Sequence, residues 1–196
     1  MIRIFPIAAP TRTTNSFGED RGGRAHQGND LFAAEGSPLV AVDSGQLRSG
    51  IDPLGGNIVN LYADDGTRYY YAHLLAFADE TRNPVSPAQG GLPPPPRRVN
   101  AGDVVGFVGR TGNAGNTPPH LHFELHPGNG VAVDPFSALE RATRIDVTRP
   151  SPVLAVTRPP IHPGIALLGA GLLAATVWAV MNPTEAARLS DRLLRF

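Results

Sequence analysis

The chain has 196 residues, and its 17 basic residues, all of them arginine, balance 17 acidic ones. Net neutrality argues against a nucleic-acid-binding protein, which carries a basic excess or patch. The absence of cysteine excludes disulfides, zinc-thiolate sites and thiol nucleophiles. A chain of this length can bury one good core, so the composition predicts one domain with an appendage.

The first fifteen residues are interpreted as an N-terminal extension. Pro6 and Pro10 interrupt any apolar run there, so the segment lacks the hydrophobic core of a signal peptide. If the protein works outside the cytoplasm, the sequence predicts that it gets there by another route.

From Phe17 to about Leu139, short β-like runs alternate with glycine-containing turns. The sequence DDGT at residues 64–67 predicts a hairpin, because Asp-Gly readily adopts the positive φ values of a tight turn. Residues 74–101 include four consecutive prolines, which cannot donate to a sheet, and predict a surface loop. Residues 133–144 predict a short closing helix. The expected fold is therefore mainly β, with antiparallel sheets.

The C-terminal part of the sequence predicts a membrane anchor. Residues 144–163 are rich in proline and are interpreted as a semi-stiff linker. Residues 164–181 carry no charge, and as a helix they would span about 27 Å, enough to cross a bilayer's hydrocarbon core. The alternative is a buried helix of a soluble core. Residues 182–196 predict a short amphipathic helix, suited to a membrane surface or to a protein partner.

Two histidines stand one residue apart in HLHFEL, within a run that predicts a strand. His120 and His122 therefore face the same side. Imidazole is both the commonest metal ligand and the commonest general acid or base, so the pair could be two ligands, or one ligand beside a catalytic group. The pair could also be incidental. Upstream, His26 and Asp30 offer nitrogen and oxygen ligands close together, although Asp30 could equally serve as a turn or capping residue.

These segments together resemble one family, both in the order of the motifs along the chain and in the residues of each motif. The lysostaphin-like or LytM-type zinc endopeptidases, which hydrolyse bacterial cell walls, share the motifs HxGxD, YAHL and HxH, found here at residues 26–30, 71–74 and 120–122. The resemblance covers about residues 16–139. It implies an antiparallel β-sheet sandwich of the LytM type, a duplicated hybrid motif, and we assign residues 16–143 to this domain.

The resemblance implies that His26, Asp30 and His122 bind Zn²⁺, while His73 and His120 flank the metal as catalytic groups. Three protein ligands leave a fourth tetrahedral position open, as catalytic zinc sites require. Such a zinc ion can lower the pKa of water toward about 7 and polarise an amide. Which of His73 and His120 is the general base stays open. The remaining histidines, His126 and His162, match no family position and are expected to be solvated.

The expected function is that of a membrane-anchored zinc metalloendopeptidase that cleaves peptide cross-links or stem peptides of bacterial peptidoglycan. The catalytic domain would face the cell wall or periplasm, or the chain would be a bacteriophage virion or lysis component. The alternative is a non-catalytic LytM-type domain that binds wall or activates a hydrolase. A biotinyl or lipoyl carrier is excluded because the chain has no lysine to modify. A phosphocarrier is disfavoured because Asp30 would repel phosphate.

Overall fold

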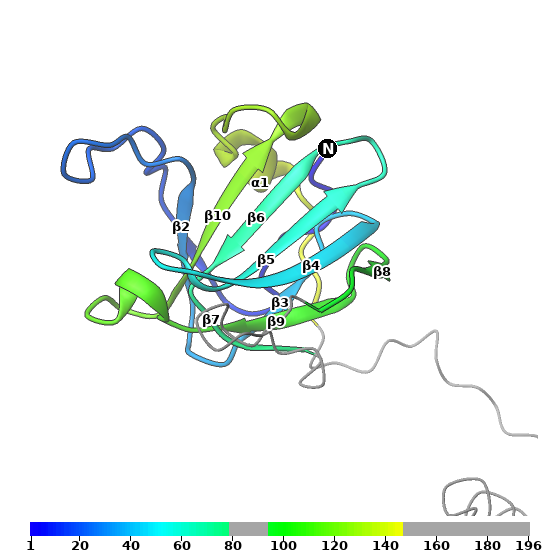
Figure 1. Ribbon diagram of the computed structural model, residues 1–196, viewed down its shortest axis with the longest axis horizontal. Coiled ribbons are helices and arrows are strands. Elements are labelled where there is room, and N and C mark those ends of the chain that lie inside the picture. Colours follow the sequence, from blue (N-terminus) through cyan, green and yellow to red (C-terminus); the bar gives the residue numbers. More distant parts are fainter. Residues whose placement is uncertain (79–93, 147–196) are drawn as a thin grey trace, which may run out of the picture. The chain divides into compact units, whose positions relative to one another are not determined.

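The computed structural model describes residues 1–78 and 94–146, which fold into two antiparallel sheets (Figure 1). The larger sheet runs, in spatial order, through β1 (Arg12–Thr13), β2 (Asn29–Phe32), β10 (His120–His126), β6 (Arg68–Ala72), β5 (Gly56–Ala63), β4 (Gly45–Asp52) and β8 (Arg97–Val99). The smaller sheet has the order β3 (Pro38–Val40), β9 (Val104–Val108) and β7 (Leu74–Phe77). Helical structure in this part of the chain comprises α1 (Phe136–Arg141) and the 3-10 turns Gly112–Ala114 and Pro127–Asn129. The predicted mainly β, antiparallel fold is thus confirmed.

One hydrophobic core joins the two sheets. Alternation along β10 sends Leu121 and Phe123, both fully buried, into this core, while His120 and His122 lie on the opposite face. Core side chains from the other strands include Leu39, Val59, Leu61, Tyr69, Tyr71, Leu74, Val105 and Val108. Because Leu121 and Phe123 must be buried in the core, His120 and His122 are held on the polar face of β10.

The predicted hairpin at residues 64–67 is present and joins β5 to β6. Gly66 has a φ of 82°, and Asp65 accepts a hydrogen bond from the Thr67 amide at 2.9 Å. The turn sets the register that pairs Val59 with Tyr71. On its other side β6 pairs with β10, and that register places Ala72 opposite His122, so His73 leaves the sheet beside the HLH segment.

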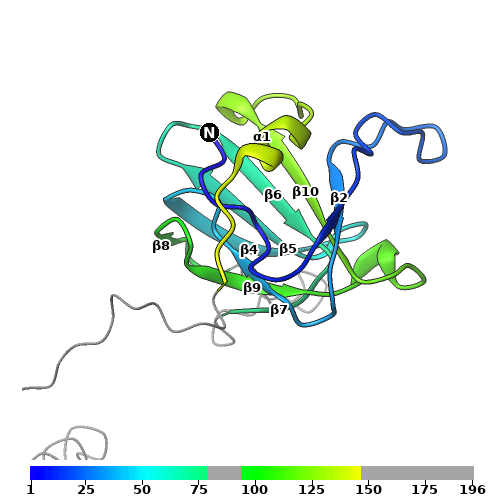
Figure 2. The same ribbon diagram turned by 180° about the vertical axis from the view of Figure 1, so that it is seen from behind.

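The first fifteen residues, expected as an extension, pack against the domain. Ile2, Phe5 and Ile7 are buried, and the Phe5 amide donates to the Thr143 carbonyl at 2.8 Å. Figure 2 shows this N-terminal segment running beside the chain that follows α1. The prolines that break the apolar run do not keep its hydrophobic side chains out of the core, because short extended segments can bury single residues between prolines.

The expectations for the C-terminal part lie mainly outside the described residues. The expected membrane span, residues 164–181, the expected amphipathic helix, residues 182–196, and residues 147–163 of the linker all lie outside the described residues. The same holds for residues 79–93 of the predicted surface loop. The ends of that predicted loop were wrong, because residues 74–77 and 97–99 form β7 and β8. Between residues 1 and 146, the described stretches contain no helix with the length and apolar character needed to cross a membrane.

Candidate metal centre

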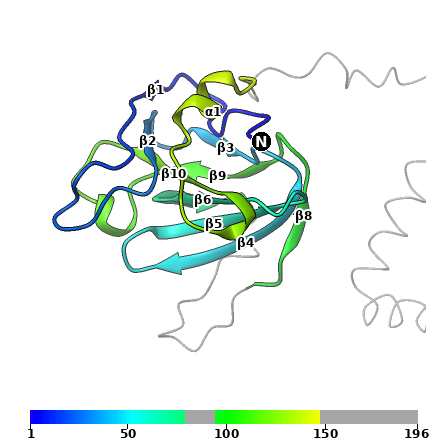
Figure 3. The same cartoon turned by 90° about the horizontal axis from the view of Figure 1, so that it is seen from above.

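Strand pairing brings the two halves of the candidate site together. β2 and β10 are antiparallel neighbours, and their register places Asp30 directly opposite His122. Directly opposite residues have Cβ atoms about 4.5–5.5 Å apart, so two side chains separated by 92 positions in sequence share one face. His26 comes from the loop that precedes β2, which projects beyond that strand in Figures 1 and 3.

The glycine between His26 and Asp30 has a steric reason. A Cβ at Gly28 would lie 2.3 Å from the Phe123 carbonyl oxygen, far inside van der Waals contact. The loop can approach β10 only because residue 28 lacks a side chain. This close approach carries His26 over the sheet toward His122, which explains why the HxGxD spacing requires glycine at its centre.

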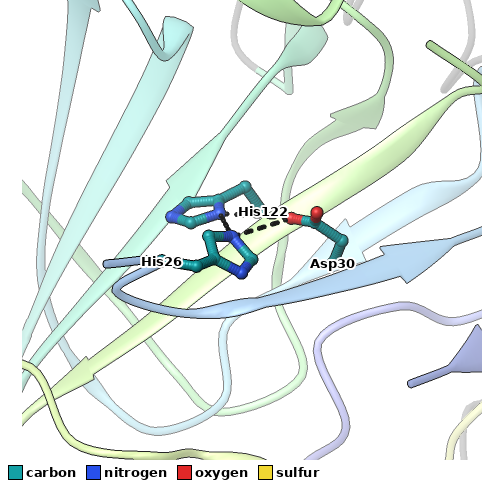
Figure 4. Close-up of side chains that lie close together, drawn as sticks. All are labelled: His26, Asp30 and His122. Carbon is teal, nitrogen blue, oxygen red and sulfur yellow. Dashed lines mark hydrogen bonds and ion pairs between the residues drawn. The ribbon is translucent and has the colours of Figure 1, made fainter. Parts of the chain in front are cut away.

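Three donor atoms converge at this point (Figure 4). His26 Nε2 lies 2.8 Å from His122 Nδ1, and each of these nitrogens lies 3.2 Å from Asp30 Oδ1. The three ligand atoms fall within 4.8 Å of one another, on side chains that are almost fully buried. Ligand atoms on a tetrahedral zinc at about 2.0–2.1 Å are separated by about 3.3 Å, so this set fits zinc after small outward shifts.

The outer atoms of the same two rings show which nitrogens face inward. His26 Nδ1 lies 2.8 Å from the Ser16 carbonyl oxygen, and His122 Nε2 lies 2.8 Å from Glu124 Oε1. Both partners are acceptors, so these outer nitrogens carry protons. In the neutral rings, two lone pairs and a carboxylate oxygen then point at one another. Such an arrangement calls for a cation, which can be a proton in the metal-free protein or a metal ion, and this is the second reason that the donor set fits a metal.

The charges of the donor set depend on one another. Burial alone would raise the pKa of Asp30, but hydrogen bonds with His122 and His26 hold it far below its ordinary value. Burial alone would lower the pKa of His122, but hydrogen bonds with Asp30 and Glu124 raise it. Asp30 is therefore ionised at neutral pH and available as an anionic ligand.

His73 and His120 lie beside the three donors without joining them. The ring centroids of His73 and His120 are 4.9 Å apart, and His120 Nε2 lies 3.9 Å from Asp30 Oδ1. Each ring places Nδ1 against a carbonyl oxygen, that of Thr111 at 2.9 Å for His73 and that of Pro118 at 2.8 Å for His120. Both rings therefore keep Nε2 for a substrate or a proton.

His73 is held in an unusual backbone conformation. Its φ is 67°, in the left-handed region that non-glycine residues seldom adopt. It stands at the break between β6 and β7, where its amide donates to the Gly55 carbonyl at 2.8 Å. This break is where the chain passes from the larger to the smaller sheet, and it turns the imidazole toward the donors. Strain of this kind concentrates at functional sites.

In the metal-free protein, His73 is expected to titrate near pH 4 by NMR. Burial and the neighbouring His120 lower its pKa to about 4 from 6.5. Because the folded-state pKa is the lower one, folding favours the neutral ring. The contribution of His73 to stability is complete above about pH 6.5 and is lost as the pH falls toward 4. A His73 titration at or above pH 6.5 would contradict this expectation.

A second glycine supports the carbonyl that orients His73. Gly112 has a φ of 69°, and a Cβ there would lie 2.2 Å from the Leu54 carbonyl oxygen. We expect Gly112→Ala to lower the free energy of unfolding by about 1–3 kcal/mol, measured by urea denaturation, because the turn after Thr111 must shift. Gly115→Ala is the matched control and is expected to be neutral, since a Cβ there would have no heavy atom within 4 Å apart from those of its two chain neighbours. Equal stability of the two variants would show that the loop adapts.

Sequence reasoning missed three residues around the donors. Arg21 Nη2 donates to Asp30 Oδ2 at 2.8 Å, which leaves Oδ1 to face the histidines. Glu124 bridges His122 and His126, with oxygen-to-nitrogen distances of 2.8 and 2.6 Å. His126 was expected to be solvated, and this was wrong: its side chain is 5% exposed. Because alternate residues of a strand share one face, the sequence also predicts that Glu124 and His126 lie on the face of His122. Arg21 lies on a loop, where no such periodicity predicts the direction of a side chain.

The five candidate residues open into one cavity of about 730 Å³. His26, Asp30, His73, His120 and His122 all line it, as do Tyr70 and Arg24. A volume of this size is typical of ligand-binding clefts. The donors therefore lie where a bound peptide could reach them.

The chain matches the family model described as Peptidase family M23 over residues 24–135, more than half of its length. It is 31% identical over 158 residues to the L-Ala–D-Glu endopeptidase of Bacillus subtilis (72% of this chain, 44% of that protein). It is 38% identical over 115 residues to the DD-carboxypeptidase/endopeptidase Mpg of Neisseria meningitidis (58% and 23%). The solved catalytic domain of lysostaphin from Staphylococcus simulans superposes with a TM-score of 0.52 at 30% identity, covering 66% of this chain and 92% of that domain. The chain spans less than half the length of the two curated relatives, but the matched region contains every candidate site residue, and the chain belongs to peptidase family M23.

Proposed function

We propose that the protein is a zinc metalloendopeptidase that cleaves peptide cross-links or stem peptides of bacterial peptidoglycan. One observation carries the proposal: the donor atoms of His26, Asp30 and His122 converge in a cavity of about 730 Å³. Three protein donors leave a position for water or substrate, as hydrolytic zinc sites do. By their names, the relatives above are an L-Ala–D-Glu endopeptidase and a DD-carboxypeptidase/endopeptidase, and peptides with D-amino acids, as in peptidoglycan, are therefore the substrates we choose.

In this proposal each residue has a separate task. Zinc bound by the three donors would polarise the scissile amide and make water a stronger acid. His73 and His120 present Nε2 beside the donors, where one ring can accept the proton of the attacking water and the other can stabilise the oxyanion or protonate the leaving amine. Tyr70 and Arg24 line the cavity in which the peptide is held.

The test is hydrolysis of purified peptidoglycan by the full chain in detergent, with and without a chelator. Mass spectrometry of the released muropeptides identifies new free amino termini. Termini that disappear with the chelator and return with zinc would support the proposal and identify the bond. Intact muropeptides with a fully zinc-loaded chain would overturn it and favour the alternative, a non-catalytic domain that binds wall or activates a hydrolase.

We also propose that residues 164–181 anchor the chain in a membrane, with the domain facing the wall or periplasm. The support is the sequence: 18 residues without a charge, following a proline-rich linker. The full chain should then resist extraction from membranes by carbonate and require detergent. Release by carbonate alone would contradict the anchor. Recovery of the chain in purified virions would instead place it in a bacteriophage, the alternative setting for the same chemistry.

A further inference from the structure

The polar face of β10 carries a row of four side chains, His120, His122, Glu124 and His126, at every second position. The proposed function uses the first two. The other two are as buried as the metal donors: the side chains of Glu124 and His126 are 12% and 5% exposed. Burying a charged or polar group costs free energy unless the group is paired, so the burial of Glu124 and His126 has to be explained by their contacts.

The contacts of these side chains form one continuous chain of hydrogen bonds. The Gly130 carbonyl oxygen lies 2.9 Å from His126 Nδ1, and His126 Nε2 lies 2.6 Å from Glu124 Oε2. The other carboxylate oxygen, Oε1, lies 2.8 Å from His122 Nε2. The chain thus begins at a backbone carbonyl and ends at the outer nitrogen of a metal donor.

The direction of each bond follows from the chemistry of its partners. A carbonyl oxygen can only accept, so His126 Nδ1 donates to Gly130. The proton between His126 Nε2 and Glu124 Oε2 can sit on either atom, but in both cases Glu124 Oε1 is left as an acceptor, so His122 Nε2 donates to it. His122 is thereby left with Nε2 as its donor and Nδ1 as its free lone pair, which is the atom that faces His26 and Asp30.

We propose that Glu124 and His126 are positioning residues that hold the His122 ring with Nδ1, not Nε2, toward the metal. A histidine ring can otherwise rotate and offer either nitrogen. Metal-binding histidines commonly donate their second nitrogen to a carboxylate, which fixes the ring and raises its basicity. Here the carboxylate is itself fixed, because His126 and the Gly130 carbonyl hold its far oxygen. The inference rests on the zinc site of the proposed function.

The test is the zinc affinity of the full chain, measured by competition with a chelator of known affinity. Glu124→Ala is expected to weaken zinc binding by about 10- to 100-fold, the range found when outer partners of metal ligands are removed. Glu124→Gln is expected to lose less, because its amide oxygen can still accept from His122 Nε2. His126→Ala is expected to weaken binding by a smaller factor than Glu124→Ala.

Leu125→Ala is the matched control for loss of stability. Leu125 lies between the two proposed residues on β10, faces the opposite side and packs against the core. This variant should unfold at a lower temperature and bind zinc like the unaltered chain. Equal losses of affinity in Leu125→Ala and Glu124→Ala would overturn the proposal, because they would trace the effect to the strand as a whole.

A spectroscopic measurement reports the ring directly. Nitrogen-15 NMR of the zinc-loaded chain should show His122 with a proton on Nε2 and the metal on Nδ1. In Glu124→Ala a mixture of the two arrangements is expected. If Glu124→Ala keeps the zinc affinity and the His122 spectrum of the unaltered chain, the positioning role is wrong, while the proposed function is unaffected. A chain that binds no zinc at all would remove the proposed function itself.

Discussion

Asp30→Asn is expected to reduce peptidoglycan hydrolysis by about 100-fold or more and to leave the purified chain with far less than one zinc. Asparagine has the same shape as aspartate, so β2 and its pairing with β10 should persist. What is lost is the only negative charge among the three donors, together with the ion pair to Arg21 at 2.8 Å. Losing a ligand must cost at least as much as losing an outer partner, for which about 10- to 100-fold is typical.

Glu19→Gln is the control for this substitution. Glu19 also pairs with Arg21, at 3.3 Å, but its side chain is 57% exposed and is not among the donor atoms. Removing its charge should leave zinc content and hydrolysis within about two-fold of the unaltered chain, because exposed ion pairs contribute little. Metal analysis and muropeptide release on the two variants decide the matter. Native zinc content in Asp30→Asn would exclude Asp30 from the donor set.

Local sequence patterns predicted the parts of the site that depend on strand alternation and turn chemistry. Alternation in HLHFEL placed His120 and His122 on one face, and Asp-Gly at residues 65–66 predicted the hairpin that joins β5 and β6. Neither inference needs knowledge of distant segments. Family motifs were needed to connect His26 and Asp30 with His122, because the register of β2 against β10 is set by the whole core and by the close approach at Gly28.

The features that sequence reasoning missed depend on contacts between distant segments. The Thr111 carbonyl that orients His73 is 38 positions away, and its place is fixed by the contact of Gly112 with residues 54–56. His126 matches no family position and stands just before Pro127, which ends its strand, so it was expected to be solvated. In the structure the turn after that proline brings the Gly130 carbonyl oxygen to 2.9 Å from His126 Nδ1, and the ring is buried. A strand end marked by proline therefore does not mean an exposed side chain.

His73→Asn is expected to lower kcat for peptide hydrolysis by about 10²- to 10⁴-fold while zinc content stays at the native level. The reason is that His73 is not among the three donors but presents Nε2 beside them. Its lowered pKa, about 4, means that at neutral pH this nitrogen carries a lone pair. His73 then starts the reaction as a proton acceptor or a neutral polar group, and not as a proton donor.

The choice of asparagine separates chemistry from backbone strain. Asparagine tolerates a positive φ better than most residues, so it suits the φ of 67° at this position, whereas alanine does not. If the imidazole is what matters, His73→Asn and His73→Ala lose the same activity, and only His73→Ala also loses stability. Recovery of activity in His73→Asn would trace the defect of His73→Ala to the backbone. Loss of zinc from both variants would instead make His73 part of the metal centre. The protein would then need another proton acceptor, and His120 Nε2, 3.9 Å from Asp30 Oδ1, is in place for that role.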